Sequence, residues 1–360
     1  SIAGSFESEI ERGALCWSNE LVLHVVELKT NGPISSLNGI DQVFQSHIQE
    51  INQRLAQWGA RLMPTAMHPW MNPEKDTRLW PHDYNVVYES YNRIFGCQGH
   101  GWSNLQSVHL NLPFANDEEF GRLHAAIRLL LPLLPALGAS SPLVECQRTD
   151  FLDNRMEFYR TNSKRIPSIT GQIIPEPVFS RDEYERQIFQ PMFENIAPLD
   201  PNGILQHEWL NARGAIARFD RNAIEIRVLD IQECPQADVS IVSIAASALQ
   251  ALIAEQWSSL EEQKRISTDT LATLFNETIR KAESTPIQNA EYLQRFGLHG
   301  KETCTAGELW NYILDRIPNS NTAIYDPIRT ILQKGSLANR IVQRLDGDLS
   351  RKSLSEVYRQ

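Results

Sequence analysis

The segment AIEIRVLD, residues 223–230, carries a carboxylate and a guanidinium two positions apart in an otherwise apolar run. Successive side chains of a β-strand point to opposite faces, so Glu225 and Arg227 share one face and the apolar residues occupy the other. A carboxylate can ligate a hard metal ion, and a guanidinium beside it can bind a phosphate or a carboxylate. The same pair would also suit a simple ion pair on a sheet, and this strand alone does not distinguish the two.

Two other segments with strand character offer polar groups of the same kind. Glu27 lies near the end of one of them, and Ser107, His109 and Asn111 alternate along the other and so share a face. Carboxylate oxygens with one imidazole suit Mg²⁺ or Mn²⁺ better than zinc. A single strand histidine can equally be a satisfied residue of the core or of the sheet rim, so the metal site is a hypothesis.

The pattern of apolar residues predicts the elements that must position these groups. Strands are expected at 20–29, 60–70, 103–114, 215–220 and 223–230. Helices are expected at 36–60, 82–95, 116–137, 181–194, 236–257, 268–283, 288–296 and 306–316, with 146–180 irregular and a polar tail at the end. The turn DRN at 220–222 predicts a hairpin between the last two strands. Strands mixed with long helices, without regular βαβ units, predict an α+β fold: an antiparallel sheet with helices on one side.

Composition excludes several classes of protein. The chain has 360 residues, 42% of them hydrophobic, and a net charge of −10, which argues against nucleic acid as the main partner. Its five cysteines are scattered and form no CxxC pair, which favours reduced thiols in the cytoplasm. No apolar run near 18 residues is evident, so no membrane is expected. The segment GCQGHG at 96–101 fits neither a dinucleotide fingerprint nor a P-loop, and no G-x-S-x-G occurs.

Six stretches in order resemble one family. They are VVELKTNGP (25–33), AMHPW (66–70), LQSVHLNLPF (105–114), GASSPLVE (138–145), YRTNSKRIPSITG (159–171) and NAIEIRVLD (222–230). Over roughly residues 15–260 the chain is similar to the glutamate–cysteine ligase and carboxylate–amine ligase family of bacteria and plants. The resemblance implies a glutamine-synthetase-like core, a curved antiparallel sheet with helices on its convex side and the site on its concave face. It also implies a reaction in which ATP and Mg²⁺ activate a carboxylate as an acyl phosphate, which an amine then attacks.

The resemblance assigns roles to residues of this chain. Three side chains match the positions of metal ligands: Glu27, His109 and Glu225. The nucleotide would be bound by His109, Asn111 and Arg227, and Arg227 and Arg160 would act in catalysis. Substrate contacts fall to His68, Arg160 and Arg165. Apart from the resemblance, His68 before Pro69 reads as a turn or as the rim of a site.

The chain departs from the family pattern in two places. The first histidine of a His-x-His pair is Ser107 here. The family also opens with a short strand of the form Gly-x-Glu-x-Glu, and no segment is expected to play that part. FESEIE, residues 6–11, contains Glu7 and Glu9 but lies too close to the strand predicted at 20–29 and lacks the usual spacer.

These observations predict an ATP- and Mg²⁺-dependent ligase. Its catalytic domain would span residues 1–260, and the helical region 261–360 would pack on the same core. The expected substrates are small molecules, by default glutamate through its γ-carboxyl and an amine such as cysteine, as in glutathione biosynthesis. A homo-oligomer is possible. Two alternatives stay open: a metal-dependent amide hydrolase that uses water, and a ligase-like protein that has lost catalysis and serves as a binding or regulatory subunit.

Overall fold

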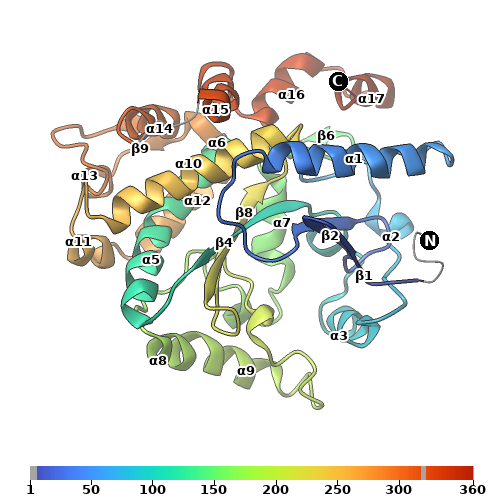
Figure 1. The fold of residues 1–360 in the computed structure, drawn as a ribbon, viewed down its shortest axis with the longest axis horizontal. Helices are drawn as coiled ribbons and strands as arrows, with labels where there is room; N and C mark the ends of the chain where they lie inside the picture. The colour runs from blue at the N-terminus through green and yellow to red at the C-terminus, as the bar shows by residue number, and fades with distance from the viewer. Residues whose placement is uncertain (1–5, 318–321, 360) are drawn as a thin grey trace.

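The computed structural model describes residues 6–317 and 322–359, and its strands form two three-stranded antiparallel sheets (Figure 1). The first sheet has the order β1-β2-β3, with β1 at Glu9–Arg12, β2 at Leu15–Asn19 and β3 at Val26–Thr30. The second has the order β4-β8-β7, with β4 at Ser107–Pro113, β7 at Ala215–Arg218 and β8 at Ala223–Asp230. Mixed helices and antiparallel strands confirm the α+β class. The predicted single curved sheet is not seen among the described residues, whose strands are divided among four sheets. The other two are two-stranded: β5 (Leu143–Val144) with β6 (Gln147–Arg148), and β9 (Pro286–Ile287) with β10 (Cys304–Thr305).

The N-terminal strands differ from the prediction. The strand expected at 20–29 begins only at Val26, and residues 20–25 form a loop in which Val22 bridges to Leu79. Residues 60–70 contain no strand either. In their place, β1 and β2 form a hairpin that the sequence pattern did not indicate. Its two-residue turn holds Gly13 at φ 69°, a conformation that glycine adopts without steric cost.

The predicted hairpin of β7 and β8 is confirmed. Its register pairs Ile216 with Glu225 and Arg218 with Ala223. The turn between the strands contains Asn222 at φ 51°, and asparagine tolerates this left-handed conformation better than most residues. The hairpin therefore fixes which side chains of β7 lie on the face of Glu225.

The long helices occur where the pattern predicted them. They are α1 (Ile40–Ala56), α3 (Asn85–Phe95), α5 (Asp117–Leu130), α10 (Pro235–Ile253), α12 (Thr268–Lys281) and α14 (Ala306–Leu314). Asn116 caps α5 by accepting a hydrogen bond from the backbone of Glu119. The helical path continues through η1 (Leu131–Leu133) to α6 (Leu134–Gly138). Shorter helices complete this part: α2 (Pro73–Asp76), α4 (His100–Ser103), α8 (Arg181–Tyr184), the π-helix η3 (Glu185–Phe189), α9 (Gln190–Ile196), α11 (Leu260–Arg265) and α13 (Ala290–Gln294).

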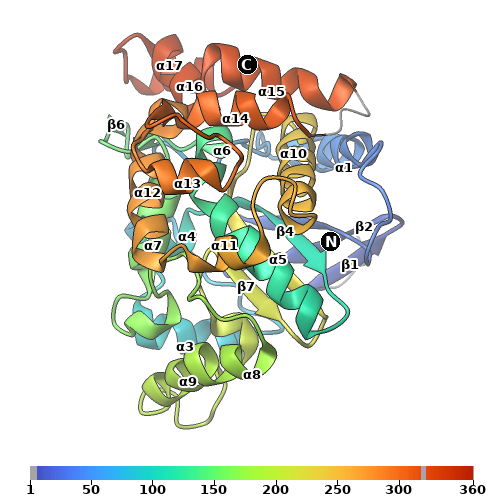
Figure 2. The ribbon, with the colours of Figure 1, turned by 90° about the vertical axis from the view of Figure 1, so that its left-hand side faces the viewer.

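Two regions are more helical than predicted. The segment 146–180, expected to be irregular, contains α7 at Asn154–Asn162, whose N-terminus is capped by Asp153. The expected polar tail contains α15 (Thr322–Lys334), α16 (Leu337–Leu345) and α17 (Arg351–Val357). Figure 2 shows these last helices covering one end of the molecule. In α16 the sequence signal for a helix is the spacing of Leu337, Ile341 and Leu345, which are four residues apart. This spacing puts them on one face of the helix, and all three are buried.

One hydrophobic core joins both parts of the chain. The apolar face of β8, formed by Ile224, Ile226 and Val228, is buried in this core together with residues of α5, α6 and α10. This packing confirms that helices cover one face of the β4-β8-β7 sheet. Trp310 of α14 and Phe275 of α12 belong to the same core. The boundary at residue 260 stays a prediction.

Two helical stretches, Asp117–Gly138 and Pro235–Ile253, are long and apolar enough to cross a membrane by length and composition alone. This differs from the prediction from sequence, which expects no apolar run near 18 residues. Within the structure, 94% and 61% of their most apolar windows are buried. Core helices of soluble proteins pass the same test, so these two helices are weak support for a membrane span.

We expect His124 of α5 to make stability depend on pH. Among the described residues, neither ring nitrogen makes a hydrogen bond of ordinary geometry, and burial lowers the pKa of His124 to about 3. Below pH 6.5 the unfolded chain binds a proton that the folded chain does not, so stability is lost as pH falls from about 6.5 towards 3. Urea unfolding at pH 7 and 4.5 should show that His124→Phe removes about 2–3 kcal/mol of this loss. Equal pH slopes in variant and wild type would contradict the prediction.

Candidate active site

Glu225 is the centre of a group of basic side chains on the polar face of β8 and its neighbours. The Nε of Arg227 lies 2.7 Å from Oε1 of Glu225, and Nδ1 of His109 lies 3.3 Å from the same oxygen. From β7, Nη1 of Arg218 lies 3.6 Å from Oε2. Glu225 and Arg218 are both buried. The predicted pair is therefore an ion pair within one strand, extended by a second arginine and a histidine.

The charges of this group follow from its surroundings. Burial alone would raise the pKa of Glu225, but Arg227, His109 and Arg218 outweigh it and hold the pKa at about 2. Burial lowers the pKa of His109 to about 4 even though Glu225 opposes the shift. At neutral pH we therefore expect a neutral His109 beside an ionised Glu225. The neutral ring can accept from the hydroxyl of Ser107, which lies 2.8 Å from Nε2.

A β-bulge sets the direction of the side chains on β8. Leu110 pairs with Ile226 and Val108 pairs with Leu229, so His109 of β4 faces two residues of β8, Arg227 and Val228. The extra residue shifts the alternation of β8, so that Asp230, opposite Ser107, follows Glu225 and Arg227 on the polar face. On the other side of the bulge, Asn111 pairs with Glu225 and shares its face.

The first sheet brings a row of acidic and basic groups to one of its faces. The register aligns Glu9, Ser18 and Glu27 across β1, β2 and β3. Ser18 donates to Glu27 at 2.6 Å, and Nζ of Lys29 lies 2.6 Å from Glu9 and 3.6 Å from Glu27. Strand β1 thus carries Glu9 and Glu11 ahead of β3, where no strand was predicted, and only the turn at Gly13 and Ala14 separates it from β2. That no segment plays the part of the family's opening strand stays a prediction.

Glu20 connects the two sheets electrostatically. Although the residue is accessible to solvent, the surrounding protein desolvates its carboxylate, and Glu27 repels it, so that the pKa of Glu20 rises to about 7. Arg227 of the second sheet acts on the same carboxylate in the opposite sense. Glu27 likewise acts on His109. The polar faces of the two sheets thus lie within electrostatic reach of each other, and Figure 1 shows β1 and β2 beside β4 and β8.

The predicted metal ligands are divided between the two sheets. Within residues 6–317 and 322–359, no three His, Cys, Asp or Glu side chains come together as a preformed metal site. His109 touches Glu225, whose oxygens face arginines, whereas Glu27 has Glu20 as its carboxylate neighbour. Mg²⁺ is often held by one or two carboxylates together with substrate phosphates. By this criterion the pair of Glu20 and Glu27 could hold Mg²⁺ when a nucleotide is bound.

Three predicted site residues have other partners. Arg160 forms an ion pair with Glu157 of its own helix at 2.5 Å, and Arg165 donates to the carbonyl of Ile94 at 2.8 Å. His68 is held through its backbone by Asn104, which both accepts from its N–H and donates to its carbonyl. In the described part of the chain, none of the three side chains bonds to Glu27, His109, Glu225 or Arg227. Their roles stay predictions.

Sequence reasoning missed two basic residues next to the site. Arg218 lies on the face of Glu225 because Ile216, two residues before it, pairs with Glu225. Alternation along the predicted strand 215–220 would have revealed this if the hairpin register had been known. Arg155 of α7 donates to the carbonyl of Arg227 at 3.1 Å. It fell in the segment predicted to be irregular, where no periodicity places a side chain.

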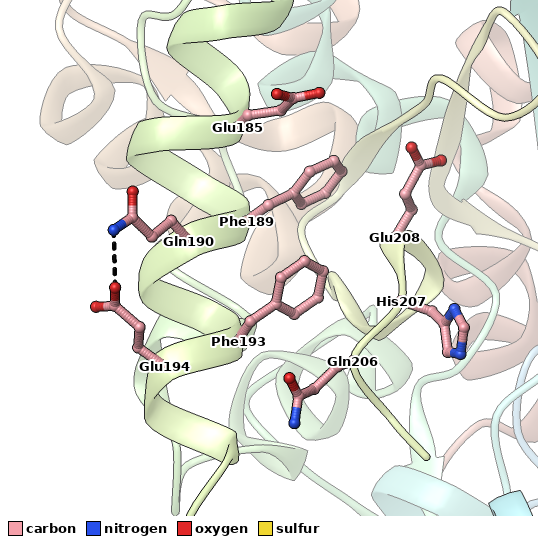
Figure 3. A pocket seen from close by; sticks show the side chains of 8 residues that line it. All are labelled: Glu185, Phe189, Gln190, Phe193, Glu194, Gln206, His207 and Glu208. Carbon is pink, nitrogen blue, oxygen red and sulfur yellow. Dashed lines mark hydrogen bonds between the residues drawn. The ribbon is translucent and has the colours of Figure 1, made fainter. Parts of the chain in front are cut away.

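A separate pocket of about 500 Å³ opens between the helices η3 and α9 and the residues before β7 (Figure 3). It is lined by Glu185, Phe189, Gln190, Phe193, Glu194, Gln206, His207 and Glu208. None of these is a predicted site residue. The pocket is nevertheless connected to the Glu225 group, because Nε of Arg218 lies 3.9 Å from Oε2 of the lining residue Glu208.

Comparison with known proteins places the chain in a family. The model of glutamate-cysteine ligase family 2 matches residues 4–359. A protein of Archaeoglobus fulgidus, described as uncharacterized, is 33% identical over 323 residues, which cover 88% of this chain and 86% of the relative. The Pup ligase PafA of the prokaryotic ubiquitin-like modification pathway, solved in complex with ADP, is 11% identical with a TM-score of 0.48; the match covers 99% of this chain and 70% of PafA. That likeness is too distant to carry an inference. The family match, which spans almost all residues and includes β1, confirms the resemblance: the chain belongs to glutamate-cysteine ligase family 2.

Proposed function

We propose that this protein is an ATP-dependent carboxylate–amine ligase that forms a γ-glutamyl amide from glutamate and an amine such as cysteine. Membership of the family supports the ligase class. The single observation that carries the proposal in this chain is the arrangement of Arg218, Arg227 and His109 around the buried Glu225. Two fixed guanidiniums on one polar face suit the binding of phosphate and carboxylate groups.

The proposed reaction needs positioning and neutralisation of charge more than covalent help from the protein. The substrate carboxylate attacks the γ-phosphate of ATP, which gives an acyl phosphate and ADP. The amine then attacks the acyl carbon and phosphate leaves. Arg227 and Arg218 would neutralise the transferring phosphoryl group. Glu225 would hold the Arg227 guanidinium in place, and Asp220 would hold that of Arg218. Asn111 and His109 would orient the nucleotide. When bound by Glu27 and Glu20, Mg²⁺ would offset the negative charge of the phosphates.

A coupled assay of ADP release tests the proposal. Full-length protein would be screened with ATP, Mg²⁺, a panel of carboxylates that includes glutamate, and a panel of amines that includes cysteine. We expect release to require the nucleotide, the metal ion, a carboxylate and an amine together. Release of ADP that does not depend on an amine would exclude the ligase, and the amide product can be identified by mass spectrometry.

A non-catalytic binding role is the second candidate. Ser107 in place of a family histidine favours it, because the hydroxyl occupies the position where an imidazole would reach the nucleotide. The other departure that supported this role concerns the segment in which β1 carries Glu9 and Glu11, and these glutamates favour the ligase. A titration with ATP separates the candidates: binding without turnover on any substrate pair supports the binding role, whereas turnover supports the ligase.

A further inference from the structure

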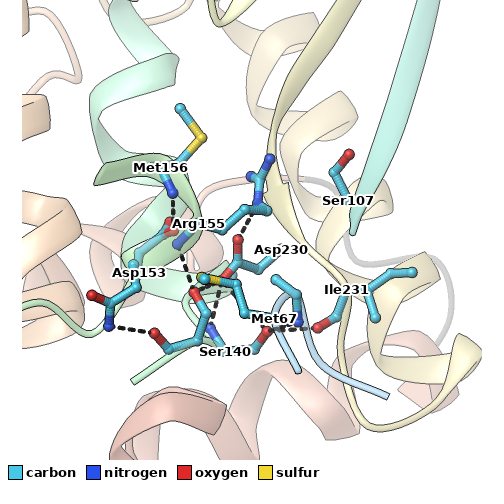
Figure 4. A network of polar contacts seen from close by, with 12 residues as sticks. Met67, Ser107, Ser140, Asp153, Arg155, Met156, Asp230 and Ile231 are labelled. Carbon is cyan, nitrogen blue, oxygen red and sulfur yellow. Dashed lines mark hydrogen bonds and ion pairs between the residues drawn. The ribbon is translucent and has the colours of Figure 1, made fainter. Parts of the chain in front are cut away.

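A buried polar network lies at the end of β8, next to the proposed site (Figure 4). Its centre is Asp230, which is 1% exposed. One carboxylate oxygen accepts from Nε of Arg155, and the other accepts from the backbone of Ser140 at 2.9 Å and from the hydroxyl of Ser141 at 2.8 Å. The carboxylate is thus fully satisfied and tied to the segment after α6 and to α7. A buried ion pair needs such hydrogen bonds to offset the loss of hydration.

Arg155 connects this network to the site strand. While Nε binds Asp230, Nη1 donates to the backbone carbonyl of Arg227 at 3.1 Å. Arg227 is one of the two residues of β8 that face His109 across the bulge. A bulge disrupts the regular ladder of hydrogen bonds, and a side-chain donor can replace the lost partner. One guanidinium therefore binds the strand on both sides of Val228 and Leu229, at Arg227 and at Asp230.

The neighbouring Asp153 leaves this pair intact. Burial, together with the charge of Asp230, raises the pKa of Asp153 well above its usual range. Asp153 caps α7 by accepting from the backbone N–H of Met156 at 2.8 Å, and Arg155 forms its ion pair with Asp230. In the described residues Nη2 of Arg155 is buried without a hydrogen-bond partner.

We propose that Arg155 is a positioning residue for the ligase reaction: by bridging Asp230 and the carbonyl of Arg227, it fixes the bulge of β8 and so holds the Arg227 guanidinium beside Glu225. This inference rests on the proposed function for its effect on turnover, but not for its effect on the strand. Without the bridge, Arg227 and Glu225 would sample more than one direction. Displacement of a catalytic group by about 1 Å can cost on the order of 10²-fold in rate.

The test compares Arg155→Met with Arg128→Met. Arg128 is equally buried and donates to Pro175, Ile266 and Thr268, all outside the site, so its loss should destabilise the fold without touching β8. Hydrogen–deuterium exchange of the peptide 223–230 under native conditions reports on the bulge and needs no activity. We expect exchange there to be faster in Arg155→Met than in Arg128→Met, by more than the difference in global stability between the two variants accounts for.

Kinetics give the second readout. In Arg155→Met, kcat for ADP release should fall at least tenfold with a smaller change in the KM for ATP, whereas Arg128→Met should keep the wild-type kcat per folded molecule. Arg155→Lys, which can still pair with Asp230, should recover part of the loss and serves if the methionine variant does not fold. Unchanged exchange in 223–230 for both Arg155 variants would overturn the proposal. If the wild type releases no ADP with any substrate pair, the proposed function fails and the exchange comparison still decides the role of Arg155.

Discussion

Glu225→Gln should reduce the kcat for ADP release by about 10²–10³-fold, a loss of the size seen when one preorganised charge is removed from an active site. Glutamine keeps the shape of the side chain but not its charge. Arg227, 2.7 Å away, would lose the anion that orients its guanidinium, whereas Arg218, 3.6 Å away, would keep its two hydrogen bonds to Asp220. The Arg227 guanidinium could then turn to solvent or to other acceptors. The measurement is the rate of coupled ADP release, expressed per folded molecule.

Loss of stability must be separated from loss of catalysis in this experiment. Removing one partner of a buried ion pair costs about 3–5 kcal/mol at most sites, so the melting temperature of the variant should also fall. Glu176→Gln is the matched control, because Glu176 pairs with the buried Arg213 at 2.6 Å away from the site. We expect the control to lose stability and to retain turnover. If both variants lose stability and both keep the wild-type kcat, the pair in β8 is only structural.

The parts of the fold that could be predicted from the sequence are those with local signals. Asn116 followed by three acidic residues marks the start of α5, and Asn222 in a polar turn marks the hairpin of β7 and β8. Both signals act over three or four residues and do not depend on the rest of the chain. In contrast, Gly13 lies between two short strands of four and five residues, where an apolar pattern is too short to stand out.

The site was only partly predictable for a related reason. Alternation within a strand places Glu225 and Arg227 together, but it cannot place Arg218, whose position depends on the register of a second strand. The bulge at His109 adds one residue and changes the direction of Asp230, which strict alternation puts on the opposite face. Arg155 reaches the strand from a helix 72 residues away in sequence. Contacts of this kind follow from packing between elements, which a pattern in one segment does not contain.

Trp310→Ala should lower the free energy of unfolding by about 3–5 kcal/mol, because Trp310 belongs to the same hydrophobic core as β8 and α5. Trp310 is fully buried, and its indole N–H donates to the carbonyl of Leu133 at 2.8 Å. The hydroxyl of Tyr292 binds the carbonyl of Leu129 at 2.7 Å in the same way. Both carbonyls belong to the continuous helical path that runs from α5 through η1.

Urea unfolding of full-length protein measures this loss, and Trp58→Ala provides the control. Trp58 is 72% exposed, so its removal should change stability by no more than about 0.5 kcal/mol.

The contacts of Trp310 and Tyr292 with Leu133 and Leu129 also predict the behaviour of a shorter chain. A chain ended at residue 260 would expose the apolar surfaces of α5 and α6 and fail to fold as a monomer. A folded, ATP-binding fragment 1–260, or a Trp310→Ala variant as stable as Trp58→Ala, would show that residues 261–360 form an independent domain. The stability of the fragment therefore decides whether the helices after residue 260 belong to the folding unit that carries Glu225.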